Sequence, residues 1–159
     1  MRQILRTLVS MATLLAAVTI FAQAANPSLG TWKLNLTKSK YDPPALAPKG
    51  QTITIQAAGQ SVKVTATGTD SQGKAISYSW TCAYDGKDCP VTGTGAPSGA
   101  DSVSQKRVDA NSIDTTYKKA GKIVQTNHSV YTTTSRTITS TGTGPTGQAT
   151  HNTTVWDKQ

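Results

Sequence analysis

The chain has 159 residues and a formal net charge of +8, from 16 Lys and Arg residues against eight acidic ones. This length suits one domain. Beyond Leu46 the chain contains no Leu, Met, Phe or Glu, a set that includes several of the strongest helix formers. Thr, Ser, Val, Ile and Gly take their place and favour strands and turns. The composition therefore excludes a mainly helical protein and predicts an all-β domain.

The N-terminus has the pattern of a secretory signal peptide. Arg2 and Arg6 precede an apolar run over residues 8–22, and Ala22-Gln23-Ala24 fits the small-x-small cleavage rule. A membrane anchor is the alternative, but the run is short for a span of about 20 residues. We expect residues 1–24 to be removed and residues 25–159 to form an exported, periplasmic or secreted domain without membrane insertion.

The basic residues are scattered along the chain after the leader. Without Arg2 and Arg6 the net charge is 8 − 2 = +6, and only Lys106-Arg107 and Lys118-Lys119 are adjacent pairs. Scattered lysines on outward strand faces protect sheet edges and favour solubility, whereas nucleic-acid binding needs a concentrated basic patch. We therefore expect a monomer that does not bind nucleic acid.

The first predicted strand covers residues 31–36, and Gly30 lies two residues ahead of Trp32. A glycine at this position allows the chain to pass close to its neighbours, so that the indole can close one end of a small barrel. Residues 38–50 contain three prolines, which block ladder hydrogen bonds. We expect this segment to be a crossover that could close over the barrel mouth as a lid.

The following segments alternate between apolar and polar residues with the period of a strand. Ile53, Ile55 and Ala57 share one face of the segment 51–57, and the same pattern continues in 61–67 and 76–84. A short strand at 89–92 and more polar strands follow at 102–108, 112–119, 122–133, 135–141 and 149–157. Short connections predict an antiparallel up-and-down meander, and closure removes its edges. We expect an 8–10-stranded lipocalin-like barrel.

The two cysteines lie on either side of Asp85-Gly86, a strong signal for a two-residue hairpin. Counting outward from this turn places Cys82 opposite Cys89, at a separation that suits a disulfide. An exported chain meets oxidants, so we predict the Cys82–Cys89 bond. A redox pair is the alternative, although the spacing is not Cys-x-x-Cys.

Four stretches resemble small exported bacterial lipocalin-like proteins: Gly30-Thr31-Trp32-Lys33-Leu34-Asn35, Lys38-Ser39-Lys40-Tyr41, Tyr84-Asp85-Gly86-Lys87-Asp88 and Val155-Trp156-Asp157-Lys158-Gln159. The resemblance runs across nearly the whole chain after the leader. It implies a calycin-type barrel with an internal pocket and no known chemistry. The chain departs from the wider lipocalins in having no evident C-terminal helix and no later motif that supplies an arginine over the tryptophan.

Neither a metal site nor a catalytic set is expected. His128 and His151 lack the clustered partners of a zinc site, and we interpret them as ordinary strand residues; a haem ligand at His128 inside the barrel is the alternative. No nucleophile elbow occurs, and without Glu a paired-carboxylate glycosidase would need two Asp residues. We therefore expect a protein without cofactor that is not an enzyme.

Aromatic residues are the candidates for a ligand pocket. The alternative for these rings is plain core packing, because the chain after the leader has no Phe. The first functional hypothesis is binding of a small, mostly apolar molecule inside the barrel; the second is a structural or interaction domain of the cell envelope with a filled core; the third is the haem-type binder. The candidate pocket residues are Trp32, Tyr78, Trp80, Tyr84, Tyr117 and Tyr131.

Overall fold

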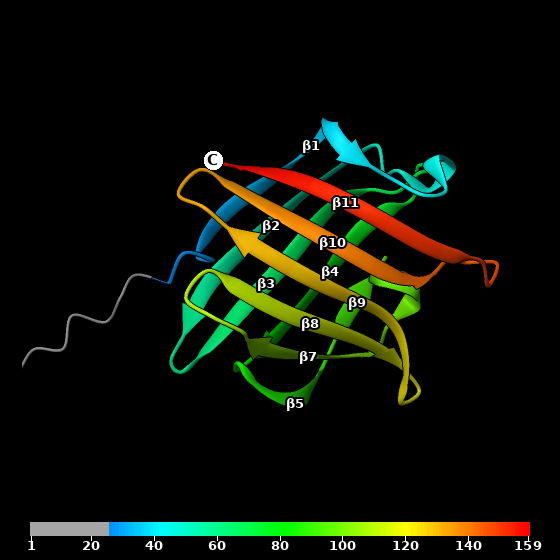
Figure 1. The fold of residues 1–159 in the computed structure, drawn as a ribbon. Coiled ribbons are helices and arrows are strands. Elements are labelled where there is room, and N and C mark those ends of the chain that lie inside the picture. Colours follow the sequence, from blue (N-terminus) through cyan, green and yellow to red (C-terminus); the bar gives the residue numbers. More distant parts are fainter. Residues whose placement is uncertain (1–25) are drawn as a thin grey trace, which may run out of the picture.

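A computed structural model describes residues 26–159, which form one antiparallel sheet of 11 strands (Figure 1). The predicted signal peptide and its cleavage after Ala24 lie outside the described residues. Two short 3₁₀-helices, η1 (Pro44–Leu46) and η2 (Pro97–Gly99), interrupt the strands. Within residues 26–159, no helix has the length and apolar character needed to cross a membrane.

The all-β antiparallel fold is as predicted, but the number of strands is 11 and not 8–10. The difference arises because the segment around the cysteines forms two short strands where the sequence indicated one at 89–92. The strands are β1 (Gly30–Lys40), β2 (Gly50–Ala58), β3 (Ser61–Thr69), β4 (Ala75–Cys82), β5 (Asp85–Pro90), β6 (Thr92–Thr94), β7 (Ser102–Arg107), β8 (Ser112–Lys119), β9 (Lys122–Tyr131), β10 (Ser135–Thr143) and β11 (Ala149–Lys158).

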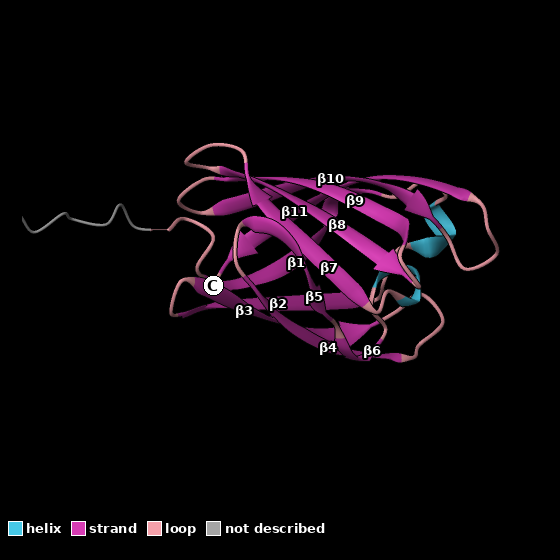
Figure 2. Cartoon of the chain, turned by 90° about the horizontal axis from the view of Figure 1, so that it is seen from below, coloured by secondary structure: helices cyan, strands magenta, loops and turns pink. Residues whose placement is uncertain are grey.

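The sheet curls into a nearly closed, calycin-like barrel. Its strand order is β5-β7-β8-β9-β10-β11-β1-β2-β3-β4-β6, so the edges are β5 and β6. β4 lies beside both β5 and β7, yet no ladder joins it to either strand. Figure 2 shows the two sides of the curled sheet facing each other, with both 3₁₀-helices at one end. The barrel therefore has one seam, between β4 and the β5–β7 pair.

The predicted disulfide is present, but the predicted hairpin around Asp85-Gly86 is wrong. Cys82 and Cys89 are joined with their Cα atoms 5.8 Å apart. β5 pairs with β7, where Cys89 is opposite Val103, while β4 pairs with β3 and β6. Residues 83 and 84 carry the chain across the seam before a hairpin can form. The disulfide thus links the two sides of the seam.

Removal of this bond is expected to destabilise the barrel. The closed loop is short, since the cysteines are seven positions apart, and loop closure of this size contributes about 2–3 kcal/mol. We expect the double variant Cys82→Ala/Cys89→Ala to lower the free energy of unfolding by about that amount in urea titrations. Titration of thiols in the unfolded, unreduced protein provides the control and should detect none. An unchanged urea midpoint in the double variant would show that the seam does not need the bond.

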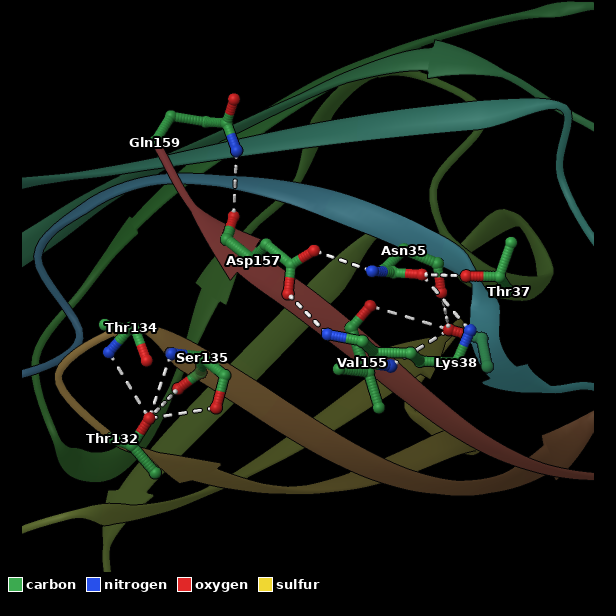
Figure 3. Close-up of polar contacts among 10 residues, drawn as sticks. Asn35, Thr37, Lys38, Thr132, Thr134, Ser135, Val155, Asp157 and Gln159 are labelled. Carbon is green, nitrogen blue, oxygen red and sulfur yellow. Dashed lines mark hydrogen bonds and ion pairs between the residues drawn. The ribbon is translucent and has the colours of Figure 1, made fainter.

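β1 continues four residues beyond the predicted end at Leu36, past an irregularity in its pairing with β11. Asn35 is opposite Val155 and Lys40 is opposite Thr153, so β1 carries extra residues here. Polar side chains stabilise the bulge: Asn35 Oδ1 accepts hydrogen bonds from Lys38 N and Thr37 Oγ1, and Ser39 Oγ accepts one from Val155 N at 3.0 Å. Figure 3 shows Asn35, Thr37 and Lys38 beside Val155 and Asp157. The alternation of apolar and polar residues does not predict side-chain hydrogen bonds of this kind.

The inner surface of the barrel has two chemically different halves. Every buried side chain of β1–β4 is apolar or aromatic. In β7–β11, polar side chains are buried among apolar ones, because Ser and Thr occupy inward positions of these strands. The buried polar residues of this half are Gln105, Ser112, Thr115, Ser129, Arg136, Ser140, Thr150 and Thr154. The more polar character of the later strands, evident in the sequence, therefore lies on the inside.

Candidate functional site

A cavity of about 580 Å³ occupies the barrel interior. It reaches the surface at the end where η1, η2 and the β3–β4 and β10–β11 turns lie, which we call the mouth. Its lining comes from both halves of the barrel. Ile53, Ile76 and Tyr78 contribute from β2 and β4; Gln125, Asn127, Arg136, Ile138, Ser140, Thr150, Thr154 and Trp156 contribute from β9, β10 and β11.

The end opposite the mouth is closed by a packed cluster around Trp32. The Trp32 side chain is fully buried, and its Nε1 donates a hydrogen bond to Ser28 O at 2.9 Å. Its ring meets Tyr131 edge-on at 5.5 Å between centroids. Lys158 Nζ lies 5.1 Å from the indole centroid, so a lysine of the last strand covers the tryptophan. These contacts hold Trp32 at the end of the barrel opposite the mouth.

Gly30 is required beside this cluster for steric reasons. Its φ of +126° is a conformation that L side chains rarely adopt. A Cβ at this position would lie 2.9 Å from Lys158 Cε, the methylene that carries the ammonium over Trp32. A side chain here would displace the lysine from the indole.

The six predicted pocket residues fall into two groups. Tyr78 and Tyr117 line the cavity, from β4 and β8. Trp32, Trp80 and Tyr131 are buried in the core outside its lining. Tyr84 is also outside it and half-buried: its hydroxyl is 3.0 Å from Ser28 Oγ, and Arg107 covers its ring at 4.3 Å. For these four residues the structure corresponds to the core-packing alternative.

Arg136 lies at the deep end of the cavity and was missed in the sequence. It is 7% exposed and is the one charged residue buried within the described part of the chain. Its Nη2 donates to Ser129 Oγ at 3.2 Å, and its Cζ lies 5.1 Å above the Tyr131 ring. Its Nε and Nη1 are buried without any hydrogen-bond partner. The alternation in β10 could have located it, since Arg136 shares a face with Ile138 and Ser140.

Burial dominates the ionisation of the cavity tyrosines. It raises the pKa of Tyr78 well above the usual value, and the neighbouring Tyr117 adds to the rise while Arg136 opposes it. Burial also raises the pKa of Tyr117, again opposed by Arg136. At the mouth, burial raises the pKa of Tyr41 to about 12. The cavity therefore presents neutral phenol groups at physiological pH.

Both histidines lie on the outer surface. His128 Nδ1 is 2.7 Å from Asp114 Oδ1, and both side chains are about half exposed. His151 is exposed on β11. Neither lines the cavity, so the hypothesis of a haem ligand at His128 inside the barrel is wrong, because alternation along β9 turns this side chain outward. Among residues 26–159, no three His, Cys, Asp or Glu side chains are grouped so as to hold a metal ion.

Comparison with known proteins places the chain by fold alone. No protein-family model matches it, and no curated protein matches. The zebrafish ileal bile acid-binding protein, solved with cholic acid, aligns over 84% of this chain and 99% of its own, with a TM-score of 0.53 and 13% identity. A redesigned β-barrel, mFAP1, bound to DFHBI, aligns over 86% and 100% of the two chains with a TM-score of 0.45 and 17% identity. The first of these two alignments supports the resemblance at the level of a calycin-type barrel fold and no further.

Proposed function

We propose that this chain is an exported, non-catalytic protein that binds a small, mostly apolar molecule inside its barrel. The observation that carries the proposal is the interior cavity of about 580 Å³, which lies within the range of about 300–1,000 Å³ that ligand sites occupy. The fold likeness to a barrel solved with cholic acid agrees with this use of the interior. The cavity also counts against the alternative of a structural domain with a filled core.

The two halves of the interior describe the ligand further. Ile53 and Ile76 form an apolar side, and the facing strands offer polar groups such as the Ser140 hydroxyl and the amide of Asn127, whose Oδ1 accepts a hydrogen bond from Gln125 Nε2. A uniformly apolar molecule would deprive buried polar groups of this lining, such as the Ser140 hydroxyl, of a ligand partner, at a cost of about 1–3 kcal/mol for each group left unpaired. The lining therefore fits a molecule with one apolar face and one polar face.

Introduction of a large side chain into the cavity tests the proposal. Ile138 lines the cavity from β10, and the next residue, Thr139, is exposed on the outer face of the same strand. We expect Ile138→Trp to lower the affinity for cholic acid, methyl cholate, dodecanoic acid and 1-dodecanol at least tenfold, because the indole takes the ligand's place. The matched variant Thr139→Trp adds the same ring outside the barrel and should bind like the unmodified protein.

Isothermal titration calorimetry on the chain after removal of residues 1–24 measures the binding. The proposal requires saturable one-to-one binding of at least one of these probes. If none binds, or if Ile138→Trp and Thr139→Trp weaken binding equally, the interior is not the site.

A further inference from the structure

Arg136 is a positive charge that the barrel itself does not neutralise. The guanidinium carries five N–H donors and a positive charge, yet it makes one hydrogen bond within the described chain, from Nη2 to Ser129 Oγ at 3.2 Å. Nε and Nη1 carry three of the five donors and have no partner. None of the four ion pairs within residues 26–159 involves Arg136.

No carboxylate of the described chain faces this guanidinium. The cavity lining includes one acidic residue, Asp70, which lies in the β3–β4 turn at the mouth, while Arg136 is at the other end of β10, where the barrel closes. Asp157 is adjacent to Trp156 in sequence but points to the outer face, where it binds Asn35 and Lys38. The other side chains that interact with Arg136 are Ser129, Tyr131, Tyr78 and Tyr117, and all four are neutral.

An unpaired buried guanidinium lowers the stability of a folded protein that has no ligand to neutralise it. A buried charge is normally paired, and one that is left unpaired destabilises the fold. The ring of Tyr131, 5.1 Å below the guanidinium carbon, offsets part of this cost, because the face of an aromatic ring attracts a cation. Arg136 lines the cavity, and three of its N–H donors have no hydrogen-bond partner.

We propose that the ligand of this barrel is an organic acid, whose anionic group enters first and pairs with Arg136 at the closed end of the cavity. The planar guanidinium suits a carboxylate, a sulfonate or a phosphate monoester, because an N–H of Nε or of Nη1 can donate side by side with the Nη2 N–H that Ser129 leaves free, which gives two parallel hydrogen bonds to two oxygens. The apolar body of the acid then lies along Ile53, Ile138 and Trp156 towards the mouth. This inference rests on the proposed function, since it names the chemical class that the same cavity takes.

Comparison of acids with their neutral analogues tests the inference in the unmodified protein. Calorimetric titrations with cholic acid and methyl cholate, and with dodecanoic acid and 1-dodecanol, give two affinity ratios. We expect each acid to bind at least tenfold more tightly than its neutral partner at pH 7.5. Neutral analogues that bind as well as the acids would overturn the inference and leave interior binding intact, whereas no binding of any probe would contradict the proposed function.

Substitution of the arginine then identifies the group responsible. In Arg136→Met, and in Arg136→Gln if the first variant does not fold, the preference for acid over neutral analogue should fall at least tenfold. Lys158→Met removes another cation that lies over an aromatic ring but does not line the cavity, and it should retain the preference. An acid preference that survives in both Arg136 variants but is lost in Lys119→Gln, at the mouth, would place the anion elsewhere and refute the assignment.

Thermal unfolding without ligand separates ligand binding from a purely structural role. If the role of Arg136 is to pair with the anionic group of a ligand, Arg136→Met should melt at the same temperature as the unmodified protein or higher, because an unpaired buried charge has been removed. Dodecanoic acid should then raise the melting temperature of the unmodified protein and not that of the variant. A large loss of stability in the ligand-free variant, together with an unchanged acid preference, would show that Arg136 stabilises the closed end of the barrel and does not bind the ligand.

Discussion

Replacement of Trp32 by alanine is expected to lower the free energy of unfolding by about 3–5 kcal/mol, the range typical for removing a large buried aromatic side chain. Trp32 is 0% exposed, and it holds three neighbours at once: Ser28 through a hydrogen bond, Tyr131 through its edge, and Lys158 through its face. Urea titration of the variant, followed by far-UV circular dichroism, measures the loss. A loss below about 1 kcal/mol would contradict the role of Trp32 in closing the barrel.

Two further variants divide this loss among the contacts of Trp32. Trp32→Phe keeps a ring in place but leaves Ser28 O without its 2.9 Å donor, so we expect a cost of about 1–3 kcal/mol from the unpaired carbonyl and the lost volume. Lys158→Met removes the cation over the indole and keeps the apolar stem, with an expected cost of about 0.5–1 kcal/mol. If Lys158→Met were as damaging as Trp32→Ala, the lysine and not the indole would hold the closed end together.

The strands could be predicted from the sequence because alternation is a local property. Ile53 and Ile55 on β2, and Ile76, Tyr78 and Trp80 on β4, are buried on the face that the alternation indicated. The pairing at the seam could not be predicted in this way. Asp85-Gly86 is a sound turn signal, but β5 gains its hydrogen bonds from β7, which follows it only after β6 and η2. Which non-local partner a strand takes depends on the closure of the whole sheet.

The candidate site could be predicted in part. Tyr78 was identified because aromatic residues stand out in a chain that is otherwise poor in large side chains, and it lines the cavity. Arg136 was missed because an arginine on a strand is ordinarily a surface residue. The signal was nevertheless present: Arg136, Ile138 and Ser140 alternate with Thr137 and Thr139, so an inward Ile138 requires an inward Arg136. The sequence does not show whether a carboxylate lies near Arg136, because this depends on how all the neighbouring strands are placed.

Alkaline pH is expected to unfold the barrel steeply, because its buried tyrosines must remain neutral. Burial raises the pKa of Tyr78, Tyr117 and Tyr131 above the value of 10.0 that an exposed tyrosine has. Below pH 10 both the folded and the unfolded chain keep these phenolic protons, so stability does not depend on them. Above pH 10 the unfolded chain releases the protons while the folded chain retains them, so the stability falls as the pH rises towards the folded-state pKa values. Each tyrosine contributes a slope of up to about 1.4 kcal/mol per pH unit.

Urea titrations between pH 8 and 11.5, with absorbance at 295 nm to detect phenolate, measure this loss. We expect the free energy of unfolding to be lost mainly above pH 10, and most of the phenolate signal to develop together with unfolding. Tyr117→Phe provides the control, because it cannot ionise and leaves the ring in the cavity lining; its slope should be smaller by the share of one tyrosine. Full tyrosine ionisation near pH 10 in a chain that still shows its native circular dichroism would contradict the burial of these phenols.

The same experiment with dodecanoic acid present connects the tyrosines to Arg136. The positive charge of Arg136 opposes the rise in the pKa of Tyr78 and Tyr117 that burial causes. An anion on the guanidinium would cancel this effect and would move phenolate formation to higher pH.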